Sequence, residues 1–353
     1  MKTETVARPG IVDALSTGLI RVWQRPWLML IPVLVDLGIW LAPRLSIQPL
    51  VESFVQSWQG MLLQAAAPGQ LPNMDQTVQL VRDAATQIGS QVNLMAVLGG
   101  SWLGAPSVVA MGQATRMTFI TDLVLAPAGL SLNTPPMAAP VWQSATMQIR
   151  GVGSLLLVVL GLWLLGQITT ALYLRWACAG WQDGSAWDGL AGFLRLVPRL
   201  ALFSIIIMVV VFVLRLPLAI ALTMLNFSNS SILAMLALMF AGVALWLTLW
   251  FLTATFFVNE AILLEGQPVG RSIARSATLV HQNFGRAIGL VAMINLLLEG
   301  FRVVWGYVGQ TPLGAALAIL GNAYLATSML MATFAFYEGL RKATVPQRAK
   351  AAN

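Results

Sequence analysis

The sequence predicts an all-α integral membrane protein: a polytopic bundle of about six transmembrane helices, with three interfacial amphipathic helices and a three-fold internal repeat. Composition is the first observation, because 58% of the residues are hydrophobic and only 9% are charged, whereas soluble domains carry about 25% charged residues. The second observation is a series of apolar runs that reach the roughly 18 residues needed to cross a bilayer as a helix. Too few charged residues remain to cover a soluble core of this size.

The formal net charge of +7 does not indicate nucleic-acid binding. The basic residues are spread singly between the apolar runs, where they set membrane topology. The one cysteine, Cys178, excludes a disulfide within the chain. The first apolar run starts near Trp27 and is not followed by a cleavage site, so we expect it to be a signal anchor.

Residues 1–43 are predicted to form a cytoplasmic amphipathic helix and the first span. The span runs from Trp27 to Pro43 and contains Asp36. Apolar residues recur at helical spacing before it, at Val12, Leu15, Leu19 and Val22.

Residues 44–141 are predicted to be an extracytoplasmic insert. An amphipathic helical pattern covers residues 50–62, and a weaker one covers residues 77–88. Residues 92–132 are apolar but broken by glycine and proline, so they form either a re-entrant segment or two further spans with Arg116 between them. The second alternative would raise the number of spans to eight.

Residues 142–340 are predicted to be a helical membrane domain with five more spans, and residues 341–353 a basic cytoplasmic tail. Amphipathic segments at residues 187–197 and 269–280 precede two of these spans. The spans themselves are expected at residues 151–174, 200–225, 231–258, 285–308 and 312–337.

Charge distribution favours both termini in the cytoplasm of a prokaryotic-type inner membrane, because this arrangement places most basic residues inside. The eight-span alternative keeps the same ends and moves only Arg116 to the inside. In the six-span arrangement, four basic residues lie outside and two lie within spans: Arg44, Arg82, Arg116 and Arg150, and then Arg215 and Arg302.

Three segments share one plan, an amphipathic basic helix followed by a span, at residues 11–43, 186–225 and 265–307. Val22-Trp23-Gln24-Arg25 aligns with Val280-His281-Gln282-Asn283. Internal repeats are common in membrane folds. Similarity of this kind also arises without shared ancestry, because juxtamembrane helices are generally basic and amphipathic.

Three motifs carry a family resemblance: Phe257-Val258-Asn259-Glu260, then Glu265-Gly266-Gln267-Pro268, then the stretch from Arg271-Ser272 to Asn283-Phe284. The chain resembles, over about residues 150–340, the membrane domain associated with glycerophosphoryl diester phosphodiesterases, and related uncharacterised six-span bacterial families. The resemblance implies a helical membrane module with no chemistry of its own. The insert departs from the family pattern.

Ionisable residues inside predicted spans are the strongest functional candidates, because they are expensive in a bilayer and are usually paired or face water. Glu299 and Arg302 are three residues apart and can pair on one helix face, and Asp36 can pair with Arg215 between helices. The alternatives are a structural ion-pair network, a substrate or ion pathway, and snorkelling to the outer interface. These four residues form the predicted intramembrane charge cluster.

Seven arginines of the amphipathic segments are candidates for contact with lipid headgroups, although their topological role would also explain them. They are Arg21, Arg25, Arg195, Arg199, Arg271, Arg275 and Arg286. Gly285 and Gly289 match a small-xxx-small pattern, which favours close helix packing within the chain.

The sequence lacks the motifs of metal, nucleotide or nucleophile chemistry, and His281 is its only histidine. We therefore expect no enzyme activity, no cofactor and no metal site. Two hypotheses remain: a non-catalytic scaffold or interaction module of the cytoplasmic membrane, with lipids and another membrane protein as partners; or a transporter or lipid-handling protein that uses the charge cluster and the glycine-rich residues 92–112. A water-filled cavity at the cluster would favour the second hypothesis, and a dry bundle the first.

Overall fold

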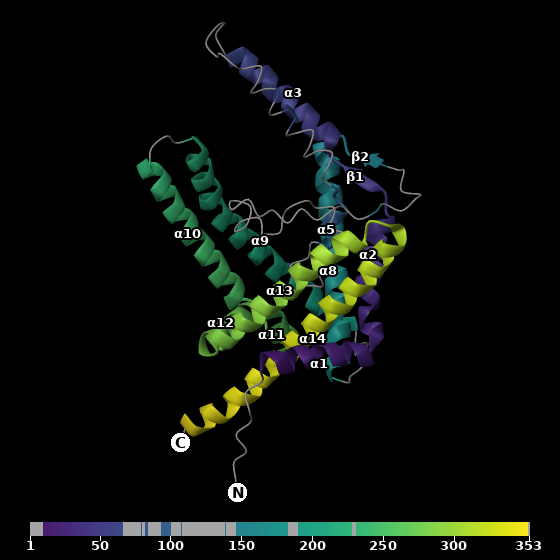
Figure 1. The fold of residues 1–353 in the computed structure, drawn as a ribbon, viewed down its shortest axis with the longest axis vertical. Helices are drawn as coiled ribbons and strands as arrows, with labels where there is room; N and C mark the ends of the chain where they lie inside the picture. The colour runs from purple at the N-terminus through teal and green to yellow at the C-terminus, as the bar shows by residue number, and fades with distance from the viewer. Residues whose placement is uncertain are drawn as a thin grey trace.

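The computed structural model describes a helical protein with one small two-stranded sheet (Figure 1). The described residues are 10–65, 79, 82–83, 93–99, 107, 138, 146–182, 190–227 and 231–351. Most of the predicted helix at residues 77–88 and most of the apolar stretch 92–132 lie outside them, so the choice between six and eight spans stays a prediction.

The chain begins with helix α1, Ile11–Gln24, which is followed by a 3-10 turn, η1, Pro26–Met29, and by α2, Leu30–Leu41. The axis bends by 97° at Arg25. Arg25 has an extended φ, as expected for a residue before proline, and Pro26 occupies the first position of the next helix, where its missing N–H is not needed. The bend makes α1 lie across the bundle while α2 runs along it (Figure 1).

Two short parallel strands, β1 (Arg44–Ser46) and β2 (Thr146–Gln148), join the two ends of the predicted insert. Neither strand was predictable from the sequence, because three residues are too few to show a period of two. Between them, α3 (Gln48–Ala65) projects from the bundle (Figure 1) and α5 (Ala96–Gly99) packs against α2 and α8. The two ends of the insert therefore lie side by side.

Three long helices follow: α8 (Val152–Gln182), α9 (Leu190–Phe227) and α10 (Ser231–Ala254). The prediction of a separate amphipathic helix before the span at residue 200 was wrong, because α9 runs through both without a break. Pro217 lies inside α9, and apolar helices tolerate such a proline when the freed backbone groups are satisfied locally.

The last part of the chain contains α11 (Val258–Glu265), α12 (Val269–Gln282), α13 (Phe284–Val308) and α14 (Pro312–Ala351). The glycine and proline of Gly266-Gln267-Pro268 are typical of a turn, and the structure has a turn there between α11 and α12. Gly266 ends α11 with φ of 65°, a left-handed conformation that a residue with a Cβ adopts at a cost.

Five described helices are long and apolar enough to cross a membrane, and the bent pair of α1 with η1 and α2 raises the number to six. We call the end of the bundle that carries α1 and α12 the α1 end, and the opposite end the strand end. The α13–α14 turn lies at the strand end, because the backbone N–H of Ala138 donates to Gly309 O (2.7 Å), while the Trp40 indole donates to Ala138 O (2.9 Å).

Helix α14 is the centre of the bundle: 67% of its most apolar stretch is buried within the protein, against 17% to 33% in the other four candidate spans. Helix α1 lies directly on α14. A Cβ at Gly18 would stand 2.2 Å from the Ser328 carbonyl oxygen and 2.7 Å from the Ala332 nitrogen. Only glycine allows this approach of two backbones.

Candidate functional site

Polar side chains of the bundle gather around the half of α14 that faces the α1 end. A polar group removed from water needs a protein partner, and in a bilayer the requirement is stronger because lipid tails offer none. Tyr173 on α8 donates its hydroxyl proton to Thr327 Oγ1 on α14 (3.0 Å), and Gln167 donates to Ser204 Oγ on α9 (3.2 Å). These bonds fix the register of α8 against its two neighbours.

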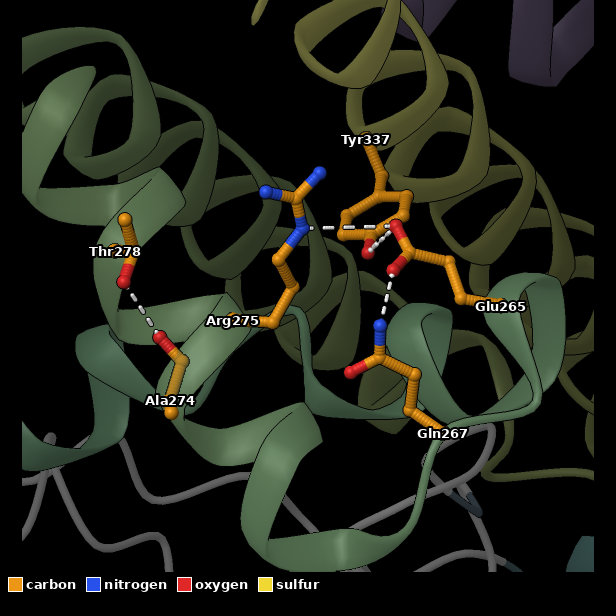
Figure 2. Close-up of polar contacts among 6 residues, drawn as sticks. All are labelled: Glu265, Gln267, Ala274, Arg275, Thr278 and Tyr337. Atoms are coloured by element: carbon orange, nitrogen blue, oxygen red, sulfur yellow. Dashed lines mark hydrogen bonds and ion pairs between the residues drawn. The ribbon is translucent and has the colours of Figure 1, made fainter. Parts of the chain in front are cut away.

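The densest group of contacts surrounds Glu265, at the end of α11 (Figure 2). Its Oε1 accepts a hydrogen bond from the Tyr337 hydroxyl (2.6 Å) and lies 3.7 Å from Arg275 Nε. Its Oε2 accepts from Gln267 Nε2 (2.8 Å). One carboxylate thus joins α11, the turn, α12 and α14. We call Glu265, Gln267, Arg275 and Tyr337 the Glu265 cluster.

Two further contacts tie the same elements together. Glu260, in the first turn of α11, is buried and its Oε1 lies 2.6 Å from the hydroxyl of Thr333 on α14. Ser276 of α12 is fully buried: its hydroxyl donates to Ala254 O (2.7 Å) and accepts from Phe257 N–H (3.0 Å). The serine satisfies the backbone where α10 ends and α11 begins.

The predicted charge cluster is described only in part. Glu299 and Arg302 form an ion pair across one turn of α13 (3.2 Å), with side chains that are 30% and 12% exposed. Asp36 is buried on α2, and its Oδ1 accepts a hydrogen bond from the Ser107 hydroxyl of the insert. The side chain of Arg215 lies outside the described residues, so the Asp36–Arg215 pair stays a prediction.

Two of the seven candidate headgroup arginines bind the carboxyl end of α8. Arg21 donates to the carbonyls of Gly180 (3.1 Å) and Trp181 (2.7 Å), and Arg25 donates to Gly180 O (2.6 Å). The Arg21 guanidinium also lies over the Trp181 ring, 5.5 Å from its centroid. A cation at this position complements the helix dipole and satisfies carbonyls that the helix leaves free.

Two more of these arginines bind the α11–α12 turn. Arg199 on α9 donates to Gly266 O (3.0 Å), and Arg275 lies beside Glu265, as described above. Their contacts are within the protein, which the sequence analysis did not expect. The alternation of apolar and basic residues shows which arginines are near the membrane surface but not which of them face another helix.

The other three arginines, Arg195, Arg271 and Arg286, are exposed. The structure gives them no hydrogen-bond or ion-pair partner within the described part of the chain. Each lies in the first or second turn of a helix that begins at the α1 end: α9, α12 and α13.

The small-residue motif on α13 behaves differently from the prediction. A Cβ at Gly285 would meet nothing within 4 Å, and one at Gly289 would meet only the Ile11 side chain, at 2.7 Å. The close approach of two helices occurs instead where Gly18 meets α14. The role of Gly18 was not predictable, because one glycine in a short amphipathic helix gives no packing signal.

Apart from Arg275, the residues of the Glu265 cluster were also not named as site residues, nor were Glu260 and Ser276. Acidic residues at the end of an apolar run were a usable signal, since Glu260 and Glu265 lie directly after the run that forms α10. Across the described ranges, no group of three or more histidine, cysteine or acidic side chains is placed to hold a metal ion. Cys178 is buried on α8, and His281 is exposed near the end of α12.

Comparisons with protein-family models, with curated proteins and with solved structures found no match to this chain.

Proposed function

We propose that this protein is a non-catalytic scaffold of the cytoplasmic membrane, which holds its helices in a fixed arrangement for another membrane protein. The observation that carries the proposal is the pairing of intramembrane polar groups with one another. Glu299 binds Arg302, Asp36 binds Ser107, and Glu260 binds Thr333. Ionisable groups used in this way fix helix packing, whereas a pathway keeps them available to a solute.

The proposed topology has six spans and both termini in the cytoplasm. The described chain begins in α1, and the C-terminal part of α14 lies at the same end of the bundle (Figure 1). An even number of crossings is needed to return the chain to that side, and α2 supplies the sixth. The positive-inside rule then makes the α1 end cytoplasmic, because the arginines of α1, α9 and α12 gather there.

We also propose that α1 and α12 are copies of one repeated unit. Both helices have 14 residues. Both end at the aligned positions Arg25 and Asn283, with similar backbone angles (φ −134°, ψ 66° and φ −130°, ψ 35°). In each, the N–H of this last residue is shared between the carbonyls three and four residues before it, and a span follows. The continuous α9 departs from this plan.

The scaffold is tested by cross-linking in the native membrane. A photo-reactive amino acid at Phe240 or Trp246, exposed positions of α10, should yield a discrete protein adduct. Leu157, an exposed position on α8, is the matched control for lipid-facing side chains. Adducts with lipid alone at every position would contradict the proposal.

One observation favours the transporter alternative. Helix α5 lies at mid-depth in the bundle, because Leu98 O is 3.6 Å from where a Cβ of Gly166 would be. Gly166 is eight residues from the end of the span predicted at residues 151–174, about 12 Å along α8, and the hydrocarbon core is about 30 Å thick. A four-residue helix ends part-way through such a core, and the backbone at its ends must be buried in protein or line a cavity.

The two functions differ in what Asp36→Asn should do. In a scaffold the variant loses thermal stability and has no effect on solute flux into liposomes. In a transporter, the wild-type protein carries a solute down its gradient into liposomes, and the folded variant carries it at a different rate. Solute flux that depends on Asp36 would therefore contradict the scaffold function and support the transporter function.

A further inference from the structure

The arginines at the α1 end divide into two groups by their partners. Arg21, Arg25, Arg199 and Arg275 bind carbonyls or a carboxylate of the protein. Arg195, Arg271 and Arg286 are exposed, and we call them the open arginines. Topology requires all of them to lie on one side of the membrane, but it does not require three of them to remain without a partner in the described protein.

The open arginines do not stabilise the helices that carry them. Arg271 and Arg286 lie in the first turn of their helices, where the dipole is positive and a cation is unfavourable, and Arg195 lies in the second turn, where the dipole has little effect. A cation that helps the fold would lie at the other end, as Arg21 and Arg25 do at the end of α8. An external negative group would explain their positions.

Two of the open arginines, Arg195 and Arg286, lie where the lipid-facing surface ends. Leu194, beside Arg195, is 61% exposed, and Phe284, two residues before Arg286, is 50% exposed. Ile288 continues the apolar surface along α13. Apolar side chains exposed on a membrane helix face lipid tails, so guanidinium groups next to the first of them reach the level of the headgroups.

The carboxylate that directly precedes the turn into α12 is already bound. Glu265 accepts from Tyr337 and Gln267 and pairs with Arg275, one turn after Arg271 on α12 (Figure 2). The counter-charge of Arg271 therefore comes from outside the Glu265 cluster. Guanidinium groups bind phosphate oxygens well because two parallel N–H donors match two acceptors.

We propose that Arg195, Arg271 and Arg286 bind the phosphate groups of anionic phospholipids in the leaflet at the α1 end. The ligand is recognised by its phosphate and its net negative charge. This interaction is independent of whether the protein is a scaffold or a transporter, since it needs only the α1 end in the headgroup layer.

The test uses the full chain in nanodiscs made of phosphatidylcholine with a minority of phosphatidylglycerol. Native mass spectrometry after release measures the ratio of the two lipids that stay bound. Each arginine near an anionic surface raises the preference for anionic lipid by a factor of about five, which corresponds to ~1 kcal/mol. We expect Arg271→Gln to lower the preference for phosphatidylglycerol by about that factor, and the triple Arg195→Gln, Arg271→Gln, Arg286→Gln variant by on the order of a hundredfold.

Arg275→Gln is the matched control, because it removes the same charge from the same helix one turn away. Its guanidinium is bound to Glu265, so the lipid preference should stay within twofold of wild type while the melting temperature falls. Arg199→Gln is a second control with an internal partner, for the case that Arg275→Gln reduces the folded yield. Equal losses of preference in Arg271→Gln and in the controls would show a general charge effect and overturn the proposal.

A measurement with inorganic phosphate distinguishes a site for lipid headgroups from a site for free phosphate. In lipid-free detergent, millimolar phosphate should leave the melting temperature of wild type and of Arg271→Gln unchanged. A rise that occurs in wild type and is absent in Arg271→Gln would assign the site to free phosphate instead. A triple variant that retains the wild-type lipid preference would also overturn the proposal.

Discussion

Helices α1 and α12 look alike in the sequence, but they are held in different ways. Each has 14 residues, ends with the same backbone geometry and leads into a span. Helix α1 buries the small residues Ala14 and Gly18, with Val22, against α14. Helix α12 buries two serines, Ser272 and Ser276, and binds the ends of α10 and α11 through the second of them. Close backbone packing distinguishes the first helix, and buried hydroxyl hydrogen bonds distinguish the second, which also buries Val269, Leu279 and Val280.

Their outer faces differ as well. On α1, Ile20 and Trp23 are exposed, and the exposed fraction of Trp23 is 79%. Arg21 of α1 and Arg25 directly after it both bind α8. On α12, the outer face carries Arg271 and Thr278. The sequences of both helices show an amphipathic pattern with basic residues. This pattern does not tell whether the outer face is apolar or polar, or whether the arginines bind another helix or remain open.

The largest expected effect is at the contact of α1 with α14. Gly18→Leu places side-chain atoms into the backbone of Ser328 and Ala332, so we expect a loss of about 3 kcal/mol or a failure to fold. Gly270→Ala on α12 is the matched control, because nothing lies within 4 Å of its Cβ position. There alanine should be neutral or stabilise by up to about 1 kcal/mol. Melting can be followed with a thiol-reactive dye, since Cys178 is buried until the protein unfolds.

The second effect concerns the serine of α12. Ser276→Ala leaves the N–H of Phe257 and the carbonyl of Ala254 without their hydroxyl partner, which should cost about 1–3 kcal/mol. Thr278→Ala removes an exposed hydroxyl that bonds to Ala274 O, and should change stability by less than about 0.5 kcal/mol (Figure 2). Equal melting temperatures for the two variants would show that the buried bonds do not hold α12.

The third effect separates bound from open arginines by stability alone. Arg25→Gln removes a charged donor from Gly180 O at the end of α8, and we expect a loss of about 1.5 kcal/mol in thermal or denaturant unfolding. Arg271→Gln should change the free energy of unfolding by less than about 0.5 kcal/mol. A larger loss in Arg271→Gln than in Arg25→Gln would contradict the division into two groups.

The smallest effect on stability is expected on the outer faces, where the readout is the surroundings of a spin label. With Cys178→Ser as the background, a label at position 20 of α1 should be more accessible to oxygen, which dissolves in lipid, than a label at position 278 of α12. The label at 278 should be more accessible to a water-soluble nickel reagent. The opposite order would place α1 in water and α12 in lipid.

Much of the fold was predictable from apolar runs, because a helix is the only way for a single segment to satisfy its backbone in lipid. The predicted span at residues 285–308 matches α13, Phe284–Val308, and Pro312 begins α14 as expected. The turn at Gly266 was also predictable from its glycine and proline. The β1–β2 pair was not, since each strand has three residues and its partner lies about a hundred residues away.

The candidate site was predictable only where partners are close in the sequence. Glu299 and Arg302 pair because three residues bring them to one helix face. The partners of Glu265, in contrast, come from α12 and α14, and Tyr337 lies 72 residues away. Spacing along the chain holds no information on such contacts.

By itself the sequence determined the helical class, the membrane environment and the positions of most spans, because these depend on transfer of each segment from water to lipid. The tertiary structure decided that α14 is central, that Gly18 packs against the backbone of α14 and that three of seven arginines remain open. Those features depend on which faces meet. Helix faces of nearly equal apolar character are distinguished by how well their shape and hydrogen-bonding groups fit the neighbouring helix.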